Sequence, residues 1–348
     1  MKPIYLLLVG LTTLPNMLRA QGCPACSNPA LQSSEKLEAG VDTLQKGSLR
    51  MTFNATNGFN YQGGHEHDRG LTAEGNEIDV PLHEHLVNLD FLRSEINLEY
   101  TFKTNWTAWL RVPYDIKKQT ANINFIEPAS QYEKDAMLRN RDIHHRTETY
   151  SGVSDFRLLV SHRLNGFLTK KGRLDVAIGA TLPFGKTEEN PLAAAENGEK
   201  HLHIQFGSGT FNPLLELHYV VSLSDRISMG LYSINKVPFY ENKKGFKAAL
   251  ETTSGLGLGY RVSDWFSVRG TLASFSQSQA KWNGVADPNS GLISFNSTIN
   301  LSFRLKKGLS ITPGYRFPLS QRTLSNAGDT FTYGHTFVLN VSYFLKQK

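Results

Sequence analysis

Paired histidines are the residues of this sequence whose spacing most clearly offers chemistry. In an extended backbone, positions i and i+2 point to the same side, so each His-x-His can present two imidazoles to one ion. Neutral imidazole suits zinc, copper and nickel. We therefore predict a divalent transition metal bound by histidine-rich loops, with these candidate ligands: His65, His67, His83, His85, His144, His145, His201 and His203.

Polar surface loops also collect histidine without binding any ion, and this alternative stays open. Acidic neighbours favour the metal reading, because Glu66, Asp68 and Glu84 offer oxygen ligands or acceptors for imidazole N–H groups. The isolated histidines, for which we expect structural roles, are His162, His218 and His335.

A Cys-Pro-Ala-Cys motif, Cys23 to Cys26, lies near the start of the chain. Such a motif binds a soft metal or exchanges disulfides, or closes a small structural disulfide in an oxidising compartment. Lipid modification of Cys23 is a third reading. The sequence leaves these three open, and it also allows this segment to engage a periplasmic protein.

Catalysis has little support in the sequence. The nucleophile elbow Gly-x-Ser-x-Gly, a phosphate-cradling glycine loop and the zinc-protease motif are all absent from the printed sequence. Glu95 and Glu99 could serve as acid and base, but charge pairing with Arg93 and Arg111 is the favoured reading. We expect no enzyme, and no cofactor beyond a zinc, copper or nickel ion.

Strands must position these residues, because apolar and polar side chains alternate from Arg50 onward. In Gly291–Leu305, isoleucine, phenylalanine and leucine fall on one face while serine, asparagine and threonine fall on the other. This period of two is typical of strands with one apolar face. Twelve such segments are predicted: Leu49–Tyr61, Leu86–Phe102, Trp106–Ile116, Gly152–Leu164, Arg173–Phe184, Phe211–Leu223, Ile227–Val237, Ala248–Val262, Trp265–Gln279, Leu292–Leu305, Leu309–Phe317 and Tyr333–Leu345.

The connections between these segments alternate between short and long. Ser263-Asp264 is a short link, for example, whereas Gln62–His85 and Lys117–Ser151 are long. Outer-membrane barrels have short periplasmic turns, long extracellular loops and an even strand count. We therefore predict an all-β fold, a transmembrane antiparallel up-and-down barrel of about 12 strands in a bacterial outer membrane.

Charge is concentrated on the polar faces of the segments, while the opposite faces carry almost none. In a membrane barrel the apolar faces contact lipid, and charged side chains line the lumen, where they can pair. The predicted lumen network comprises Arg93, Glu95, Glu99, Arg111, Asp155, Arg157, Glu216, Arg269, Arg304 and Arg316.

The chain divides into three predicted parts. Residues 1–20 are expected to be a signal peptide, because Lys2 precedes a short apolar core and Ala20 is a small residue before a cleavage site. Residues 21–48 form a periplasmic segment with the two cysteines, and residues 49–348 form the barrel. A net charge of +6 without a basic arm argues against a nucleic-acid partner.

Three short stretches carry a family resemblance. They are Ser151–Arg157 with a Gly-x-x-Asp strand, Leu182–Lys186 with a Pro-Phe-Gly strand end, and Gly207–Phe211 with a Gly-x-Gly-Thr strand start. In these motifs the sequence resembles the outer-membrane transporters named for the meta-cleavage pathway of phenol degradation. The resemblance covers about a third of the chain and implies a barrel that passes small molecules.

Three functions fit the sequence. The first is an outer-membrane transport barrel that admits a small molecule or metal ion and binds a metal at its histidine-rich loops. The second is a passive channel for small organic compounds, in which the histidines are incidental. The third is a structural or partner-binding barrel that transports nothing. Membrane lipid surrounds the barrel in all three.

Overall fold

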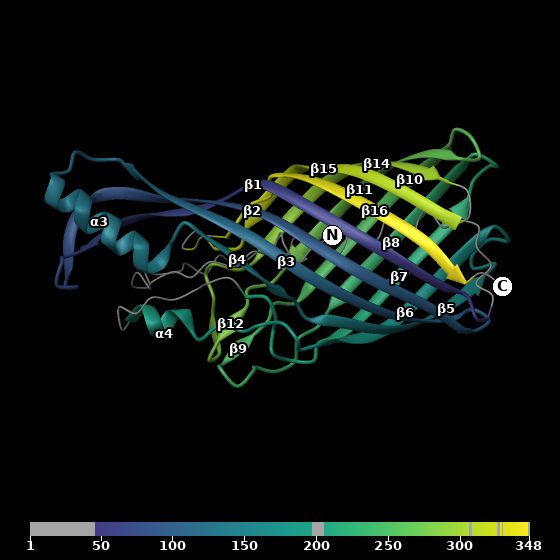
Figure 1. Cartoon of the computed structure of the whole chain (residues 1–348), viewed down its shortest axis with the longest axis horizontal. Coiled ribbons are helices and arrows are strands. Elements are labelled where there is room, and N and C mark those ends of the chain that lie inside the picture. The colour runs from purple at the N-terminus through teal and green to yellow at the C-terminus, as the bar shows by residue number, and fades with distance from the viewer. Residues whose placement is uncertain (1–45, 197–204, 306–307, 326–327, 329, 347–348) are drawn as a thin grey trace, which may run out of the picture.

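The chain forms a closed antiparallel barrel of twelve strands, as predicted (Figure 1). The computed structural model describes residues 46–196, 205–305, 308–325, 328 and 330–346. Each strand pairs with its sequence neighbours, and β1 also pairs with β16, which closes the wall. The barrel strands are β1 (Leu49–Leu71), β2 (Glu77–Lys103), β3 (Trp106–Phe125), β5 (Phe156–Asn165), β6 (Gly172–Leu182), β7 (Pro213–Ser222), β8 (Ile227–Lys236), β10 (Glu251–Arg261), β11 (Phe266–Gln277), β14 (Leu292–Arg304), β15 (Leu309–Thr323) and β16 (His335–Lys346).

One wall position is shared by two strands. The first half of β3 pairs with β5, and its second half pairs with a further strand, β4 (Glu148–Val153). The segment predicted as one strand, Gly152–Leu164, is therefore interrupted, and Ser154 and Asp155 lie at the break. This interruption frees Asp155 from the strand pairing.

The outer surface of the barrel is apolar and the inner surface is polar. Ile178, Leu258 and Phe295 are 63%, 54% and 53% exposed on the outside, whereas Asn54 and Asn97 are buried inside. In water an exposed apolar belt of this kind is unfavourable, and in lipid it is the normal outer face of a spanning barrel. The fold therefore belongs in a bacterial outer membrane.

Among the described residues, no helix is long and apolar enough to cross a membrane.

β1, β2 and β3 continue past the rim of the barrel as a three-stranded extension, here called the arm (Figure 1). Helix α3 (Gln131–His144) follows β3 and contacts all three strands of the arm. The stretch predicted as the loop Gln62–His85 is therefore mostly strand, with a turn only at Thr72–Asn76. Outside the membrane neither face of a strand must be apolar, so the hydrophobic alternation stops where strand pairing continues.

A β-bulge decides which way the arm histidines of β1 point. Gly58 pairs with Phe91 and Tyr61 pairs with Leu89, so two residues of β1 stand opposite one residue of β2. Asn60 adopts a left-handed φ of 56°, and its N–H donates to Asp90 Oδ1 at 3.0 Å. Because side chains alternate along a strand, this one extra residue reverses the facing of everything beyond it.

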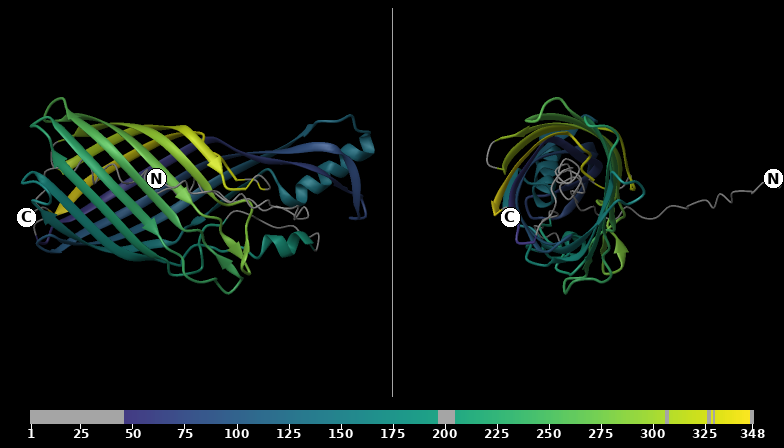
Figure 2. Two further views of the ribbon diagram at one scale, coloured as in Figure 1. Left: turned by 180° about the vertical axis from the view of Figure 1, so that it is seen from behind. Right: turned by 90° about the vertical axis from the view of Figure 1, so that its right-hand side faces the viewer.

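Short turns join the strands at the end of the barrel that carries the C-terminus, and the long connections lie at the other end (Figure 2). The long connections contain α4 (Pro191–Glu196) and a small sheet of β9 (Phe246–Lys247), β12 (Lys281–Trp282) and β13 (Val285–Ala286). By the rule for outer-membrane barrels, the turn end faces the periplasm and the arm is extracellular.

Candidate functional site

The inner face of the arm gathers five imidazoles. His65 pairs directly with His85 across β1 and β2, and His67 pairs with His83 in the same way. His145, just after α3, completes the group, which we call the histidine cluster. Neighbouring ring centroids lie 5.1 to 5.9 Å apart. The strand pairing and the bulge thus place all four strand histidines on one face.

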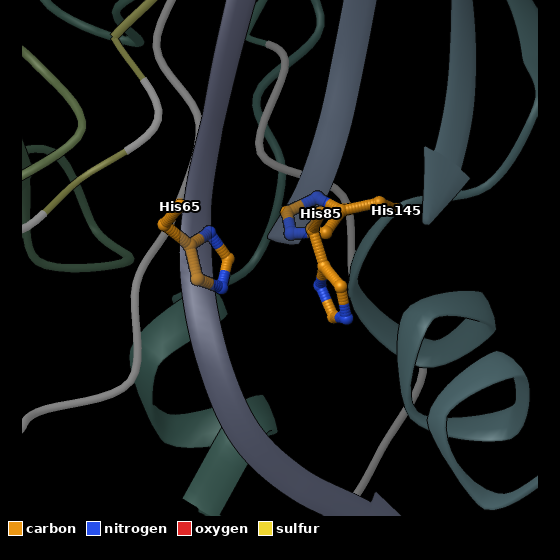
Figure 3. A group of neighbouring side chains, drawn as sticks. All are labelled: His65, His85 and His145. Atoms are coloured by element: carbon orange, nitrogen blue, oxygen red, sulfur yellow. The ribbon is translucent and has the colours of Figure 1, made fainter. Parts of the chain in front are cut away.

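Three of these rings converge as a candidate metal site (Figure 3). His65, His85 and His145 each offer one nitrogen, and the three nitrogens lie within 4.8 Å of one another. Zinc held tetrahedrally at Zn–N distances of about 2.0–2.1 Å separates its ligand nitrogens by roughly 3.4 Å. Side-chain rotations that bring the rings about 1 Å closer would therefore suffice. The residues fit zinc, copper or nickel, all of which accept imidazole.

Hydrogen bonds assign the tautomers of the other two rings. His83 Nδ1 lies 3.0 Å from the Pro81 carbonyl, which can only accept, so the proton of neutral His83 sits on Nδ1. Its Nε2 lone pair then faces His85 Nε2 at 3.2 Å. The Arg69 N–H donates to His67 Nδ1 at 3.0 Å. His83 is thus poised to orient His85 or to join the ion, while Nδ1 of His67 is already occupied.

Burial keeps these two imidazoles neutral. Burial, followed by repulsion from His65 and His83, lowers the pKa of His67 to about 4. The pKa of His83 is also lowered, again chiefly by burial. A metal competes with the proton for the imidazole lone pair, so a neutral ring is the form that binds. At neutral pH His67 and His83 therefore offer lone pairs instead of positive charge.

The remaining predicted metal ligands are not part of this geometry. His144 ends α3, and its side chain lies outside what the structure describes. His201, His203, Cys23 and Cys26 also fall outside the described residues. All five histidines of the cluster are among the predicted ligands. Four of them come from the two His-x-His pairs, whereas His145, predicted as part of the pair His144-His145, reaches the group through the fold.

An apolar cluster separates the histidines from the lumen. Tyr61, Leu89 and Phe91 of β1 and β2 meet Phe275 of β11 from across the barrel, and Tyr150 of β4 packs against the group. We call it the mouth cluster. Its buried members are Tyr61, Val87, Leu89, Phe91, Phe275, Leu292, Phe331 and Tyr333. Its aromatic rings pack edge to face, as Tyr61 does on Phe91 at 5.0 Å.

On the lumen side of the mouth cluster, the inner wall carries buried ion pairs. Arg93 binds Asp115 through two hydrogen bonds of 2.7 Å, and Arg111 binds Glu216 through two of 2.6 and 2.9 Å. Two-pronged Arg–carboxylate contacts of this kind fix geometry as well as charge. Further pairs join Arg157 to Glu95 at 3.4 Å and Arg50 to Glu99 at 2.6 Å.

Three other arginines of the predicted lumen network lie elsewhere. Arg316 donates to Tyr61 Oη at 2.9 Å and covers the ring of Tyr333 at 4.4 Å, so it supports the mouth cluster. Arg269 is buried and donates to Ser228 Oγ at 3.1 Å. Arg304 is exposed at the turn end of β14, beyond the buried pairs. The alternation placed it on the inner face without marking where the barrel ends.

Asp155 joins the three motifs that carry the family resemblance. Its Oδ1 accepts the N–H of Gly185 at 3.1 Å, and its Oδ2 accepts the N–H and hydroxyl of Ser208 at 2.8 and 2.7 Å. A side chain at Gly207 would place its Cβ 2.4 Å from Asp155 Oδ1. These contacts, here called the Asp155 clasp, hold residues 205–212 against the wall. The sequence pattern had instead predicted that Asp155 belongs to the lumen charge network.

A cavity of about 200 Å³ opens beside the clasp. Phe206, Phe246 and Trp282 form an apolar wall, and charged residues such as Lys117 and Glu216 face it from the strands. An engineered apolar cavity of about 150 Å³ holds benzene, so this space fits one small organic molecule. The apolar wall comes from the long connections, where alternation gave no signal.

Asp287 is a buried carboxyl in the lining of this cavity. Its Oδ1 accepts the N–H and the side-chain amide of Asn289 at 3.0 and 3.1 Å. Burial nevertheless raises the pKa of Asp287 from 3.8 to about 7. No motif or periodic pattern in the sequence marks Asp287 as a site residue.

Replacing Asp155 with alanine should release residues 205–212. The substitution leaves the Gly185 and Ser208 N–H groups without their acceptor, and each such loss costs about 1–3 kcal/mol. We expect amide hydrogen exchange over 205–212 to speed up by about tenfold or more. Asp264→Ala, in an exposed turn, is the control. Equal exchange in both variants would contradict the clasp.

Asp287 should make stability depend on pH. Between pH 3.8 and about 7 the folded protein holds a proton that the unfolded chain has lost, so stability falls as pH rises through that range and levels off above it. Asp287→Asn accepts the same bonds but cannot ionise, so it should remove this loss. Thermal unfolding at pH 5 and pH 8 tests it, and identical pH responses in the two proteins would show that Asp287 does not titrate there.

Comparison with known proteins supports the fold. No family model matches the sequence, and no curated protein matches it. An outer membrane channel from Pseudomonas putida F1 superposes with a TM-score of 0.52 at 12% identity, over 86% of this chain and 96% of the channel. A FadL homologue from Pseudomonas aeruginosa gives 0.42 at 10% identity, over 86% and 91%. The chain therefore has the fold of a 12-stranded outer-membrane barrel.

Proposed function

We propose that this barrel passes a small organic solute across the outer membrane without catalysis. The observation that carries the proposal is the cavity beside the Asp155 clasp, which lies within the barrel wall and offers an apolar face and a charged face together. Small-molecule sites usually combine a largely apolar concave surface with a few polar groups. The similar channel from Pseudomonas putida and the family resemblance add support for transport.

A non-catalytic role also fits the lumen carboxylates. Glu95 and Glu99, the candidate acid and base, are each paired with an arginine. Ion pairing gives both carboxylates a structural role, so neither needs a catalytic one to account for its position in the lumen. The lumen charges serve instead as the polar lining of the solute path.

We propose in addition that the histidine cluster binds one divalent transition-metal ion through His65, His85 and His145. Their convergence on the arm, outside the lumen, favours this second role. Along β1 and β2 the mouth-cluster residues Tyr61 and Leu89 lie between the histidines and the barrel, so we assign the ion to the arm and not to the solute path.

Solute flux tests the first proposal. Uptake into proteoliposomes would be compared for benzenesulfonate and gluconate, two anions that cross lipid poorly, one apolar and one rich in hydroxyls. We expect faster uptake of benzenesulfonate, and Trp282→Ala should reduce its advantage about fivefold, the effect of roughly 1 kcal/mol of aromatic contact. Trp265→Ala, on the lipid side at 59% exposure, should change nothing. Absence of flux for either anion would favour a structural or partner-binding barrel.

Zinc titration tests the second proposal. We expect His65→Ala, His85→Ala and His145→Ala each to weaken zinc binding by about 100-fold or more, since altering even a residue that only orients a ligand costs 10–100-fold. His335→Ala, in the barrel wall, should bind zinc like the unmodified protein. Calorimetry in detergent measures both. Unchanged affinity in His145→Ala would show that the three rings do not share an ion.

A further inference from the structure

Helix α3 is attached to the arm by one small apolar cluster and a few polar contacts. Ala136 and Met137 are its only fully buried apolar side chains among the described residues, and they pack on Val80. Arg139 Nε donates to the Leu71 carbonyl at 2.7 Å, and Asn140 Nδ2 donates to the Arg69 carbonyl at 2.8 Å. The rest of the helix is mostly polar. A helix of 14 residues is marginal in water without packing. The stability of α3 therefore depends on these contacts with the arm.

The two ends of α3 are secured differently. At the N-terminus Ser130 and Glu133 form a reciprocal capping box, with bonds of 3.3 and 2.7 Å. This cap is local, and the first turn contacts the arm through Lys134, whose Nζ lies 5.3 Å from the centroid of the Phe125 ring of β3.

At the C-terminus His145 is the capping residue, and its side chain is completely buried in the histidine cluster. The next two residues bind β3, because the Arg146 carbonyl accepts from Gln119 Nε2 at 3.0 Å and Thr147 Oγ1 accepts from the Ala121 N–H at 3.1 Å. His145 is the residue that brings this end of the helix to β1 and β2.

An ion in the cluster would link three separate segments. His65 belongs to β1 and His85 to β2, whereas His145 belongs to the connection between α3 and β4 (Figure 3). Before any ion binds, ring contacts of 5.3 Å join His145 to each of the other two. Coordination would replace these ring contacts with bonds from one ion to all three imidazoles. Those bonds can form only while the connection that carries His145 stays against β1 and β2. A ligand that binds only the docked arrangement stabilises that arrangement.

We propose that a divalent transition-metal ion held by His65, His85 and His145 fastens α3 and its following connection, residues 131–147, to the β1–β2 hairpin. The inference rests on the proposed metal site and adds its consequence. The extracellular arm is a metal-responsive element, with α3 docked when the ion is bound and more often released when it is absent.

Hydrogen exchange on the full-length protein in detergent tests this, with zinc chloride as the probe. At a zinc concentration 100 times the dissociation constant, exchange over residues 131–147 should slow by up to about 100-fold. Peptides of β14 should not respond. His145→Ala should lose the zinc effect over 131–147, while Met137→Ala should exchange faster without zinc and still be protected by it.

The outcomes separate the two proposals. Zinc binding by calorimetry without slower exchange over 131–147 overturns the fastening of α3 and leaves the metal site standing. Equal zinc protection in His145→Ala also overturns it, because His145 is the only proposed link to α3. Failure of zinc to bind overturns the metal site, and the fastening with it.

Discussion

Closed antiparallel strand pairing is the constraint on which the rest of this structure depends. Because lipid offers no hydrogen bonds, every backbone group in the wall must be paired, and the pairing fixes which way each side chain points. Arg93, Glu95 and Asp115 therefore face inward whether or not their burial is favourable. These inward charges are compensated by close pairs between nearby strands, as in Arg93 with Asp115 and Arg157 with Glu95.

The candidate sites lie where the regular strand pairing is interrupted. The bulge at Asn60 turns His65 and His67 toward His83 and His85, and the gap between β4 and β5 frees Asp155 to hold the inward segment. Both interruptions lie at the rim, where strand pairing is no longer enforced by lipid. The apolar wall of the cavity likewise comes from connections such as the one containing Trp282.

The sequence predicted the barrel well and the sites only in part. Alternation identified all twelve wall segments, because lipid on one side and polar lumen on the other impose a period of two. It could not show that the arm is paired strand, since apolar and polar residues do not alternate regularly there. Four histidines of the cluster followed from spacing, but His145 lies sixty residues from His85 along the chain and joins only through α3. Trp282 and Asp287 depend on loop folding, which leaves no periodic signal.

The length of the arm sets where the histidine cluster meets its surroundings. Phe59 is the last residue of β1 paired with β16, and His65 lies six residues further on, about 20 Å along the strand. Electrostatic fields from anionic lipid headgroups fade within about 8–10 Å at physiological salt. The ion proposed to bind at the cluster would therefore come from the bulk medium and not from the cation layer concentrated at the membrane surface. The arm would respond to the concentration outside the cell, unaffected by the charge of the lipids around it.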